Sequence, residues 1–193
     1  MRLTGLWIAA ALLWASAADA ADWKLYTFSD QGFAIESPVP LTKGAGLYRG
    51  AVAGRIPTVT YTGELDKIRY KVSVVDISSR PSEAVNLYLE MEFLTGLAGG
   101  KVIGNDSVGL DPGKDRKYGR ELAIETKDGS LMRVTLLYFG GKIYQVEGTV
   151  LPGGEKDSFL PARFTGSLLV DLANLDKARA RDADPANFTT PDG

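Results

Sequence analysis

Three runs of strand-forming residues follow one another in the second half of the chain, and short glycine-containing turns separate them. The runs cover Tyr118 to Thr126, Ser130 to Phe139 and Ile143 to Val150. Such short turns join antiparallel neighbours, because a parallel connection needs a dozen residues or more. The sequence therefore predicts a three-stranded antiparallel meander, and this feature limits the choice of fold more than any other.

The side chains of the meander predict how its strands pair. We expect three-residue loops at Lys127-Asp128-Gly129 and at Gly140-Gly141-Lys142, each with a glycine in the left-handed position. This choice places apolar residues opposite one another on one buried face. The predicted pairs are Leu122–Val134, Ile124–Met132, Tyr138–Tyr144, Leu136–Val146 and Val134–Gly148.

A second hairpin is predicted around the turn Asp66-Lys67. Its expected register joins opposite charges and joins apolar residues, which is how cross-strand pairs stabilise a sheet. One face of this hairpin is then apolar and the other polar. The predicted pairs are Leu65–Ile68, Glu64–Arg69, Tyr61–Val72 and Val59–Val74.

Two helices are expected. The first runs from Ser82, a good N-cap, to Ala98, where Gly99-Gly100 ends it. We expect it to pack on the sheet, because its polar side carries glutamates and no Lys or Arg, the wrong charge for an anionic membrane. Its predicted buried stripe is Val85, Leu89, Phe93 and Leu97, widened by Tyr88, Met91 and Leu94. The second helix covers residues 158–167, with Pro161 in its first turn and Phe159, Leu160, Phe164 and Leu168 as its buried side.

Short apolar runs at Trp23 to Phe28 and Phe33 to Ser37 predict two strands. Between them and the 59–74 hairpin, residues 42–57 contain four glycines and two arginines, Arg49 and Arg55. This composition predicts a mobile loop with a short strand around Leu47-Tyr48.

Composition excludes several classes of function. The 193 residues include no His and no Cys, with 22 Lys and Arg against 24 Asp and Glu. Disulfides, thiolate nucleophiles, Ser-His-Asp triads and Cys- or His-based metal sites are therefore excluded. The slightly acidic balance argues against binding to nucleic acid. We expect no cofactor and no metal site, since no glycine-rich dinucleotide loop or calcium loop occurs.

The chain divides into three parts. Residues 1–20 are typical of a secretory signal peptide, with Arg2 before an apolar stretch and Ala18-Asp19-Ala20 at the expected cleavage site. Residues 21–170 are expected to form a single domain. Residues 171–193 are predicted to be a polar, disordered tail. These features predict an exported protein, periplasmic or secreted, with no membrane span once the leader is removed.

Several short segments resemble the Mog1/PsbP-like group of α+β domains. The resemblance spans about residues 23–170 and implies an antiparallel sheet of about six to seven strands packed between helices, as in a sandwich. It implies a non-catalytic scaffold and brings no catalytic residues with it. The matching segments are Gly-Phe-Ala-Ile-Glu-Ser-Pro at 32–38, Tyr-Gly-Arg-Glu-Leu at 118–122, Gly-Ser-Leu-Met-Arg at 129–133, Ile-Tyr-Gln-Val at 143–146 and Ala-Arg-Phe-Thr-Gly-Ser-Leu at 162–168.

The predicted meander places one polar cluster on its outer face. This candidate binding surface consists of Glu121, Glu125, Arg133, Gln145 and Glu147. Three interpretations remain open: a solvated face with weak ion pairs, a partner-binding surface, or a carboxylate pair for acid–base chemistry.

Two functions from different classes follow. The first is an exported, soluble, non-catalytic binding or accessory module for a partner protein or small ligand. It would act through a sheet face, a helix face or the Arg49/Arg55 loop. The alternative is a small periplasmic hydrolase or lyase that uses Glu or Asp together with Arg or Lys. An enzyme should line a deep pocket with Glu121, Glu125 or Glu147, whereas a module should present a shallow apolar patch.

Overall fold

The computed structural model describes residues 22–51, 54–79, 86–110 and 117–172. The expected leader and the predicted helix start at residues 82–85 lie outside these ranges. A turn that the sequence Asp111-Pro112-Gly113 predicts lies outside them too. Residues 173–193, nearly all of the expected tail, lie outside them as well.

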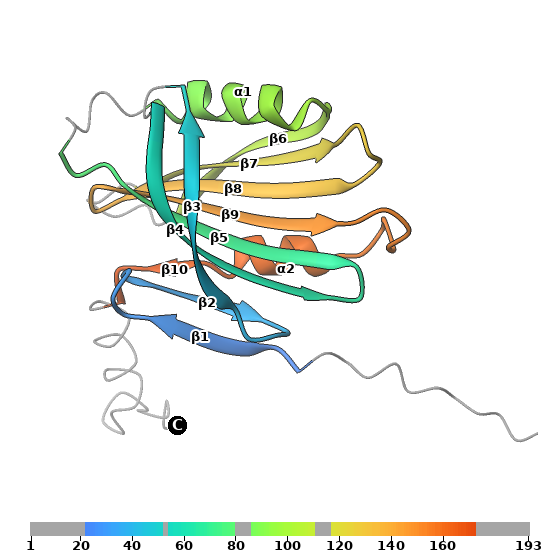
Figure 1. Cartoon of the computed structure of the whole chain (residues 1–193), viewed down its shortest axis with the longest axis horizontal. Coiled ribbons are helices and arrows are strands. Elements are labelled where there is room, and N and C mark those ends of the chain that lie inside the picture. The colour runs from blue at the N-terminus through green and yellow to red at the C-terminus, as the bar shows by residue number, and fades with distance from the viewer. Residues whose placement is uncertain (1–21, 52–53, 80–85, 111–116, 173–193) are drawn as a thin grey trace, which may run out of the picture.

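Two antiparallel sheets and two helices make up the described fold (Figure 1). The large sheet has the order β3-β4-β5-β9-β8-β7-β6, and the small sheet has the order β1-β2-β10. The predicted α+β architecture is confirmed, whereas the small second sheet was not predicted. The large-sheet strands are β3 (Thr42–Gly50), β4 (Gly54–Leu65), β5 (Ile68–Asp76), β6 (Lys101–Leu110), β7 (Lys117–Glu125), β8 (Leu131–Phe139) and β9 (Lys142–Val150). The small-sheet strands are β1 (Lys24–Phe28), β2 (Phe33–Ser37) and β10 (Leu169–Val170), and the helices are α1 (Leu87–Ala98) and α2 (Leu160–Gly166).

The β4–β5 hairpin has the predicted register, with Leu65 opposite Ile68 and Glu64 opposite Arg69. Asp66 and Lys67 form its two-residue turn, and their φ angles are 49° and 61°. Positive φ at both central residues is the type I′ geometry, whose twist matches that of the flanking strands.

The meander is confirmed at β7–β8 and wrong by one residue at β8–β9. Leu122 faces Val134 as predicted, but Leu136 faces Gln145 and not Val146. The β8–β9 connection has two residues, because Gly140 and Gly141 both adopt positive φ, at 58° and 76°. Two successive glycines satisfy a type I′ turn, so the shorter loop forms.

The predicted loop over residues 42–57 is also wrong. Its first part is the edge strand β3, which pairs with β4 along its whole length, from Thr42 opposite Thr62 to Gly50 opposite Gly54. The glycines of β3 carry no side chain, and this lets the strand lie close to threonine side chains of β4 such as Thr58 and Thr60.

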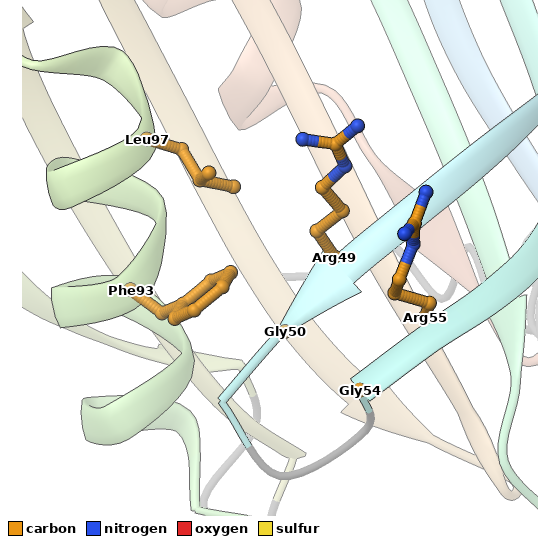
Figure 2. A pocket seen from close by; sticks show the side chains of 6 residues that line it. All are labelled: Arg49, Gly50, Gly54, Arg55, Phe93 and Leu97. Atoms are coloured by element: carbon orange, nitrogen blue, oxygen red, sulfur yellow. The ribbon is translucent and has the colours of Figure 1, made fainter.

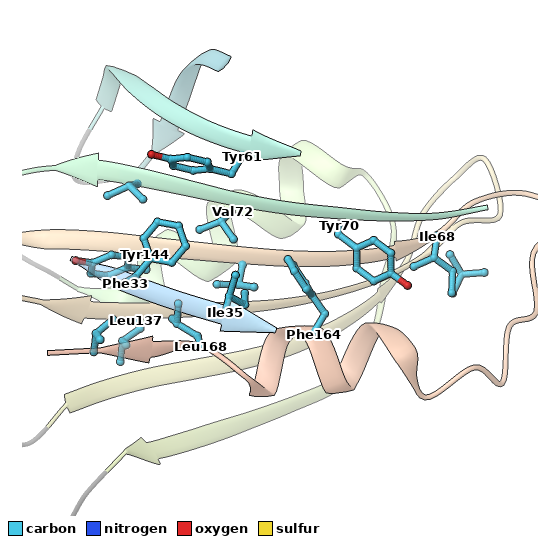
Figure 3. Close-up of a cluster of buried hydrophobic side chains, with 14 residues drawn as sticks. Phe33, Ile35, Tyr61, Ile68, Tyr70, Val72, Leu137, Tyr144, Phe164 and Leu168 are labelled. Carbon is cyan, nitrogen blue, oxygen red and sulfur yellow. The ribbon is translucent and has the colours of Figure 1, made fainter. Parts of the chain in front are cut away.

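Two hydrophobic cores lie on the two faces of the large sheet. The first packs β2, β10 and α2 against β4, β5, β8 and β9, with Phe33, Tyr70 and Phe164 at its centre (Figure 3). The second lies between the sheet and α1 and includes Leu122, Val134 and Leu136. The helix α1 contacts β3 at one edge of the sheet and also β7 and β8, so the sheet curls around it.

The observed α1 differs from the prediction in the face that it buries. Asn86 caps the helix by accepting a hydrogen bond from the Leu89 amide at 3.3 Å. Leu87 and Met91 are buried, with Leu94 and Ala98 packed beside them. Met91 and Leu94 were predicted to lie in the buried stripe and do, but Leu89, Phe93 and Leu97 of the same stripe are 44%, 40% and 49% exposed.

The second helix agrees better with its prediction. Pro161 lies in the first turn of α2, where its missing N–H removes no helical hydrogen bond. Phe164 and Leu168 are buried as expected, but Phe159 is 68% exposed. Within the described part of the chain, neither helix is long and apolar enough to cross a membrane.

Candidate functional site

The five residues of the predicted binding surface lie on opposite faces of the large sheet. Glu121, Glu125 and Arg133 lie on the face that carries α2, because they alternate with residues buried beneath α1. Gln145 and Glu147 lie on the α1 face, since they alternate with residues of the other core. The one-residue shift at β8–β9 separates them, because side chains alternate along a strand. The prediction that the five share one face is therefore wrong.

The three glutamates of this set form three separate ion pairs. Glu121 pairs with Arg133 at 3.3 Å, and Glu125 pairs with Lys156 at 3.3 Å. Glu147 pairs with Lys71 at 2.8 Å and also accepts a hydrogen bond from the side-chain amide of Gln145 (Nε2) at 2.6 Å. Partly exposed pairs of this kind contribute under ~1 kcal/mol each. They are the arrangement expected of a polar sheet surface.

These glutamates also line none of three concave sites that the described residues form. Among the same residues, no cluster of three carboxylates has the geometry to hold a metal ion. Among the described residues, Glu121, Glu125 and Glu147 lie in ion pairs on the sheet and outside these three concave sites.

A different region brings together side chains of complementary kinds. We call it the hairpin–helix surface: the end of the β3–β4 hairpin with Arg49 and Arg55, and Leu89, Phe93 and Leu97 on α1. The two arginines alternate along their strands with Tyr48 and Ile56, which pack toward α1, so the arginine side chains leave the hairpin on its other face. Figure 2 shows Phe93 and Leu97 pointing from α1 toward the hairpin, and the two arginines side by side on neighbouring strands. Four of these residues line a cavity of about 280 Å³ together with Gly50 and Gly54.

The two arginines lie directly opposite each other in the register of β3 and β4. Like charges in that position destabilise a sheet. Neither guanidinium has an ion pair with any residue of the described ranges. The hairpin end therefore carries two adjacent positive charges that this part of the chain does not neutralise.

A buried carboxylate fixes the hairpin end to the helix. Glu90 on α1 is 2% exposed and accepts hydrogen bonds from the Tyr48 hydroxyl at 2.8 Å and from the Ala51 amide at 3.1 Å. Burial and the Glu90 carboxylate raise the pKa of Tyr48, so its hydroxyl stays protonated and donates. A Cβ on Gly50 would lie 2.0 Å from the carboxylate, so only glycine permits this approach. The two halves of the surface are thereby held in a fixed relation.

Chemically, this region can bind but offers no acid–base pair. The arginines can donate hydrogen bonds to a carboxylate or phosphate, and the three apolar side chains can bury apolar area. Glu90 is already engaged with Tyr48 and the Ala51 amide, away from solvent.

Sequence analysis named Arg49 and Arg55 as part of a loop but did not join them to the helix. A signal was nevertheless present, because α1 carries two apolar stripes. One contains Leu87 and Met91, and the other contains Leu89, Phe93 and Leu97. A short helix lying on one face of a sheet buries one stripe, and the second is left for solvent or a partner.

No protein-family model and no curated protein matches this sequence. Among solved structures, the chain is similar to the cyanobacterial PsbP protein (CyanoP) of Synechocystis sp. PCC 6803, with a TM-score of 0.52. The sequence identity is 13%, and the match covers 80% of this chain and 95% of the cyanobacterial one. The chain has a PsbP-like fold. The expected resemblance is confirmed at the level of the fold.

The second structure is a protein of unknown function, PA94 of Pseudomonas aeruginosa, matched with 11% identity and a TM-score of 0.36. That match covers 89% of this chain and 98% of the other. At 13% identity the match to the cyanobacterial structure shows the fold alone, so the residues of the hairpin–helix surface are interpreted from their own geometry.

Proposed function

We propose that this protein is an exported, non-catalytic binding module that docks on a partner through the hairpin–helix surface. The observation that carries the proposal is the exposed apolar row Leu89, Phe93 and Leu97 of α1, next to a hairpin end whose other face carries the unneutralised pair Arg49–Arg55. Each half of this surface is unfavourable in an isolated protein. The arginines repel one another, and the row exposes apolar area to water.

Features that violate local folding rules are most often found where a protein functions. Single exposed apolar residues are ordinary, but Leu89, Phe93 and Leu97 follow one another along successive turns of one helix. The Glu90 anchor adds a second argument, because it holds the repelling hairpin end against the helix. A preorganised surface loses less conformational entropy when it binds.

Export is supported by the secretory pattern of residues 1–20 and by the absence of cysteine, which suits an oxidising compartment. Mass spectrometry of the protein recovered from an exporting host should place its N-terminus near residue 21. Intact Met1 on the recovered soluble protein would contradict export.

The experiment for binding is a quantitative capture of partners from an extract of the exported compartment. We compare the wild-type protein with the double variant Phe93→Ser/Leu97→Ser. Phe159→Ser is the matched control, because Phe159 is an exposed aromatic residue at the N-cap of the other helix, α2. The expected result is a partner whose recovery falls about tenfold or more with the double variant and stays unchanged with the control.

Thermal unfolding of the three proteins separates lost binding from lost folding. Equal recovery with the wild type and a folded double variant would contradict the proposal. The catalytic alternative has its own test: Glu121→Gln or Glu147→Gln should abolish a turnover while the fold survives. No observation on Glu121 or Glu147 favours that outcome, since each carboxylate lies in its own ion pair.

A further inference from the structure

We infer that the partner docks as an extended segment, which adds one strand to the large sheet next to β3 and covers Phe93 and Leu97 of the apolar row on α1. The inference rests on the proposed function, because it states how a partner occupies the hairpin–helix surface. The occupant is a strand of another protein with apolar side chains at alternate positions.

The β3 edge of the large sheet is regular and exposed. β3 pairs with β4 in an unbroken register, and among the described residues no strand pairs with its other side. Residues 42–45 and Leu47 are exposed. The opposite edge differs, because the pairing of β6 shifts between Val102 and Gly104. A bulge turns an edge away from further pairing, whereas a regular edge presents N–H and C=O groups that an added strand can bond.

The apolar row of α1 lies next to this edge. The sheet curls around α1, which contacts β7 and β8 as well as the edge strand β3. Figure 2 shows Phe93 and Leu97 pointing from α1 toward the side of β3 that lies away from β4. A cavity of about 280 Å³ lies where Phe93 and Leu97 meet the end of the hairpin. These two side chains are therefore exposed because the sheet ends at β3, and one further strand would cover them.

Two glycines of β3 leave room for the side chains of that strand. Gly44 and Gly46 alternate with Tyr48, whose side chain packs in the core beneath α1, so both glycines lack a side chain on the α1 side. Large side chains of a neighbouring strand can fold over an edge glycine. An added strand with apolar residues at alternate positions would place them over the glycines and against Phe93 and Leu97.

Other segments of this chain fit the edge less well. Antiparallel pairing of β3 with β3 of a second copy, over its whole length, would place Lys43 opposite Arg49. Like charges in that position destabilise a sheet. Residues 173–193 contain Pro185 and Pro191 and no alternating run of large apolar residues. The observations therefore favour a strand of another protein.

The test begins with a random peptide library displayed on phage, with the protein recovered from an exporting host as bait. We expect enrichment of peptides with large apolar residues at alternate positions and no proline between them. Phe93→Ser/Leu97→Ser should weaken the binding of one selected peptide about tenfold or more, measured by fluorescence anisotropy. Phe159→Ser is the control and should leave the affinity unchanged. Thermal unfolding checks that each variant is folded.

Amide hydrogen exchange, measured by NMR with and without the selected peptide, tests the edge directly. In an antiparallel pair, every second amide of β3 donates to β4 and the others point outward. The outward amides between Lys43 and Arg49 should exchange about tenfold more slowly, or slower still, when the peptide is bound. The outward amides of β6 are the matched control, because β6 is the other edge strand of the same sheet. Their exchange should not change.

Three outcomes would overturn the inference. In the first, no peptide is enriched, or the enriched peptides carry apolar residues spaced three and four apart, as in a helix. In the second, the peptide binds without slowing exchange in β3. In the third, the β3 amides are protected without peptide in a manner that depends on protein concentration, which assigns the edge to a second copy.

Failure of the inference can be told apart from failure of the proposed function. If Phe93→Ser/Leu97→Ser abolishes capture from the extract while peptide binding leaves the β3 amides unprotected, the proposed function stands and strand addition falls. If the double variant changes neither capture nor peptide binding, both fall.

Discussion

The two hairpins that share strand β4 follow opposite rules. At the β4–β5 end, Glu64 lies opposite Arg69 and the two form an ion pair at 3.5 Å. At the β3–β4 end, Arg49 lies opposite Arg55, and the two charges repel. Both ends are strand pairs of the same sheet, so the difference does not come from their architecture.

The repulsion between Arg49 and Arg55 in the β3–β4 hairpin is compensated by a contact from outside its two strands. The Glu90 carboxylate reaches from α1 to the Tyr48 hydroxyl and the Ala51 amide, and this contact replaces the stabilisation that cross-strand charges give the first hairpin. A hairpin held by complementary charges stabilises only itself. A hairpin held by a buried anchor can present unfavourable charges to a partner.

The largest expected effect comes from breaking that anchor. In Gly50→Ala the new methyl group would meet the Glu90 carboxylate at 2.0 Å and displace it from its donors. We expect a loss of about 2–4 kcal/mol in the free energy of unfolding, measured by urea denaturation.

Gly54, which lies opposite Gly50 in the β3–β4 pairing, provides the control. Gly54 has φ +73° and nothing within 4 Å of an added Cβ. Gly54→Ala should therefore lose only about 1–2 kcal/mol, from the left-handed backbone alone. Equal losses for the two glycines would show that the Glu90 contact does not hold the hairpin end.

An intermediate effect is expected from Tyr48. Its pKa is raised by burial and then by Glu90, above the ordinary value of about 10. The folded state therefore keeps this proton longer than the unfolded state. The resulting stability is fully present below about pH 10 and is lost as the pH rises above it.

Tyr48→Phe removes this titration together with the hydrogen bond. It should lose about 1–3 kcal/mol at neutral pH and show a shallower fall of stability above about pH 10. Denaturation at a series of pH values measures both. A residual slope is expected, because burial also raises the pKa of Tyr144 and raises that of Tyr70 to about 12. An unchanged slope would mean that Tyr48 ionises in the folded state as freely as in the unfolded one.

The smallest effects test the charge comparison itself. Arg55→Thr should raise the free energy of unfolding by about 0.2–1 kcal/mol, since it removes a like-charge pair. Arg69→Thr should lower it by under ~1 kcal/mol, since it removes an exposed ion pair. Thermal and urea unfolding should give changes of opposite sign in the free energy of unfolding for the two variants. Changes of the same sign would show that the two hairpins do not differ in how their paired charges affect stability.

The β4–β5 register could be predicted from sequence because only one side of that hairpin is apolar and its charges pair in one way. The β8–β9 register could not. Residues 134–137 of β8 and 143–146 of β9 are buried on both faces of the sheet, so no alternation of apolar and polar residues fixes how the strands align. Leu136 can face Val146 or Gln145 with little change in burial. The two-glycine turn decides, and its φ angles are not visible in the sequence.

The candidate site shows a similar limit. Arg49 and Arg55 were singled out from the sequence as part of a loop. They lie opposite each other only because β3 is a regular strand, and the glycines of β3 had predicted a loop there. The apolar row of α1 was recognised and assigned to the core. Which of two stripes a helix buries depends on where the sheet curls around it, and that is a property of the whole fold.

The order of strands in the large sheet has a kinetic consequence. Strands β3 to β5 pair with their neighbours in sequence, and so do β6 to β9, whereas β5 and β9 are joined across the chain between Asp76 and Lys142. Each group can assemble through short hairpin loops, whose closure is fast. Joining the groups requires closure of one long loop, which carries the larger entropy loss. Pairing of β5 with β9 should therefore limit the folding rate, and stopped-flow refolding of a variant such as Val72→Ala in that pairing would show it as slower folding.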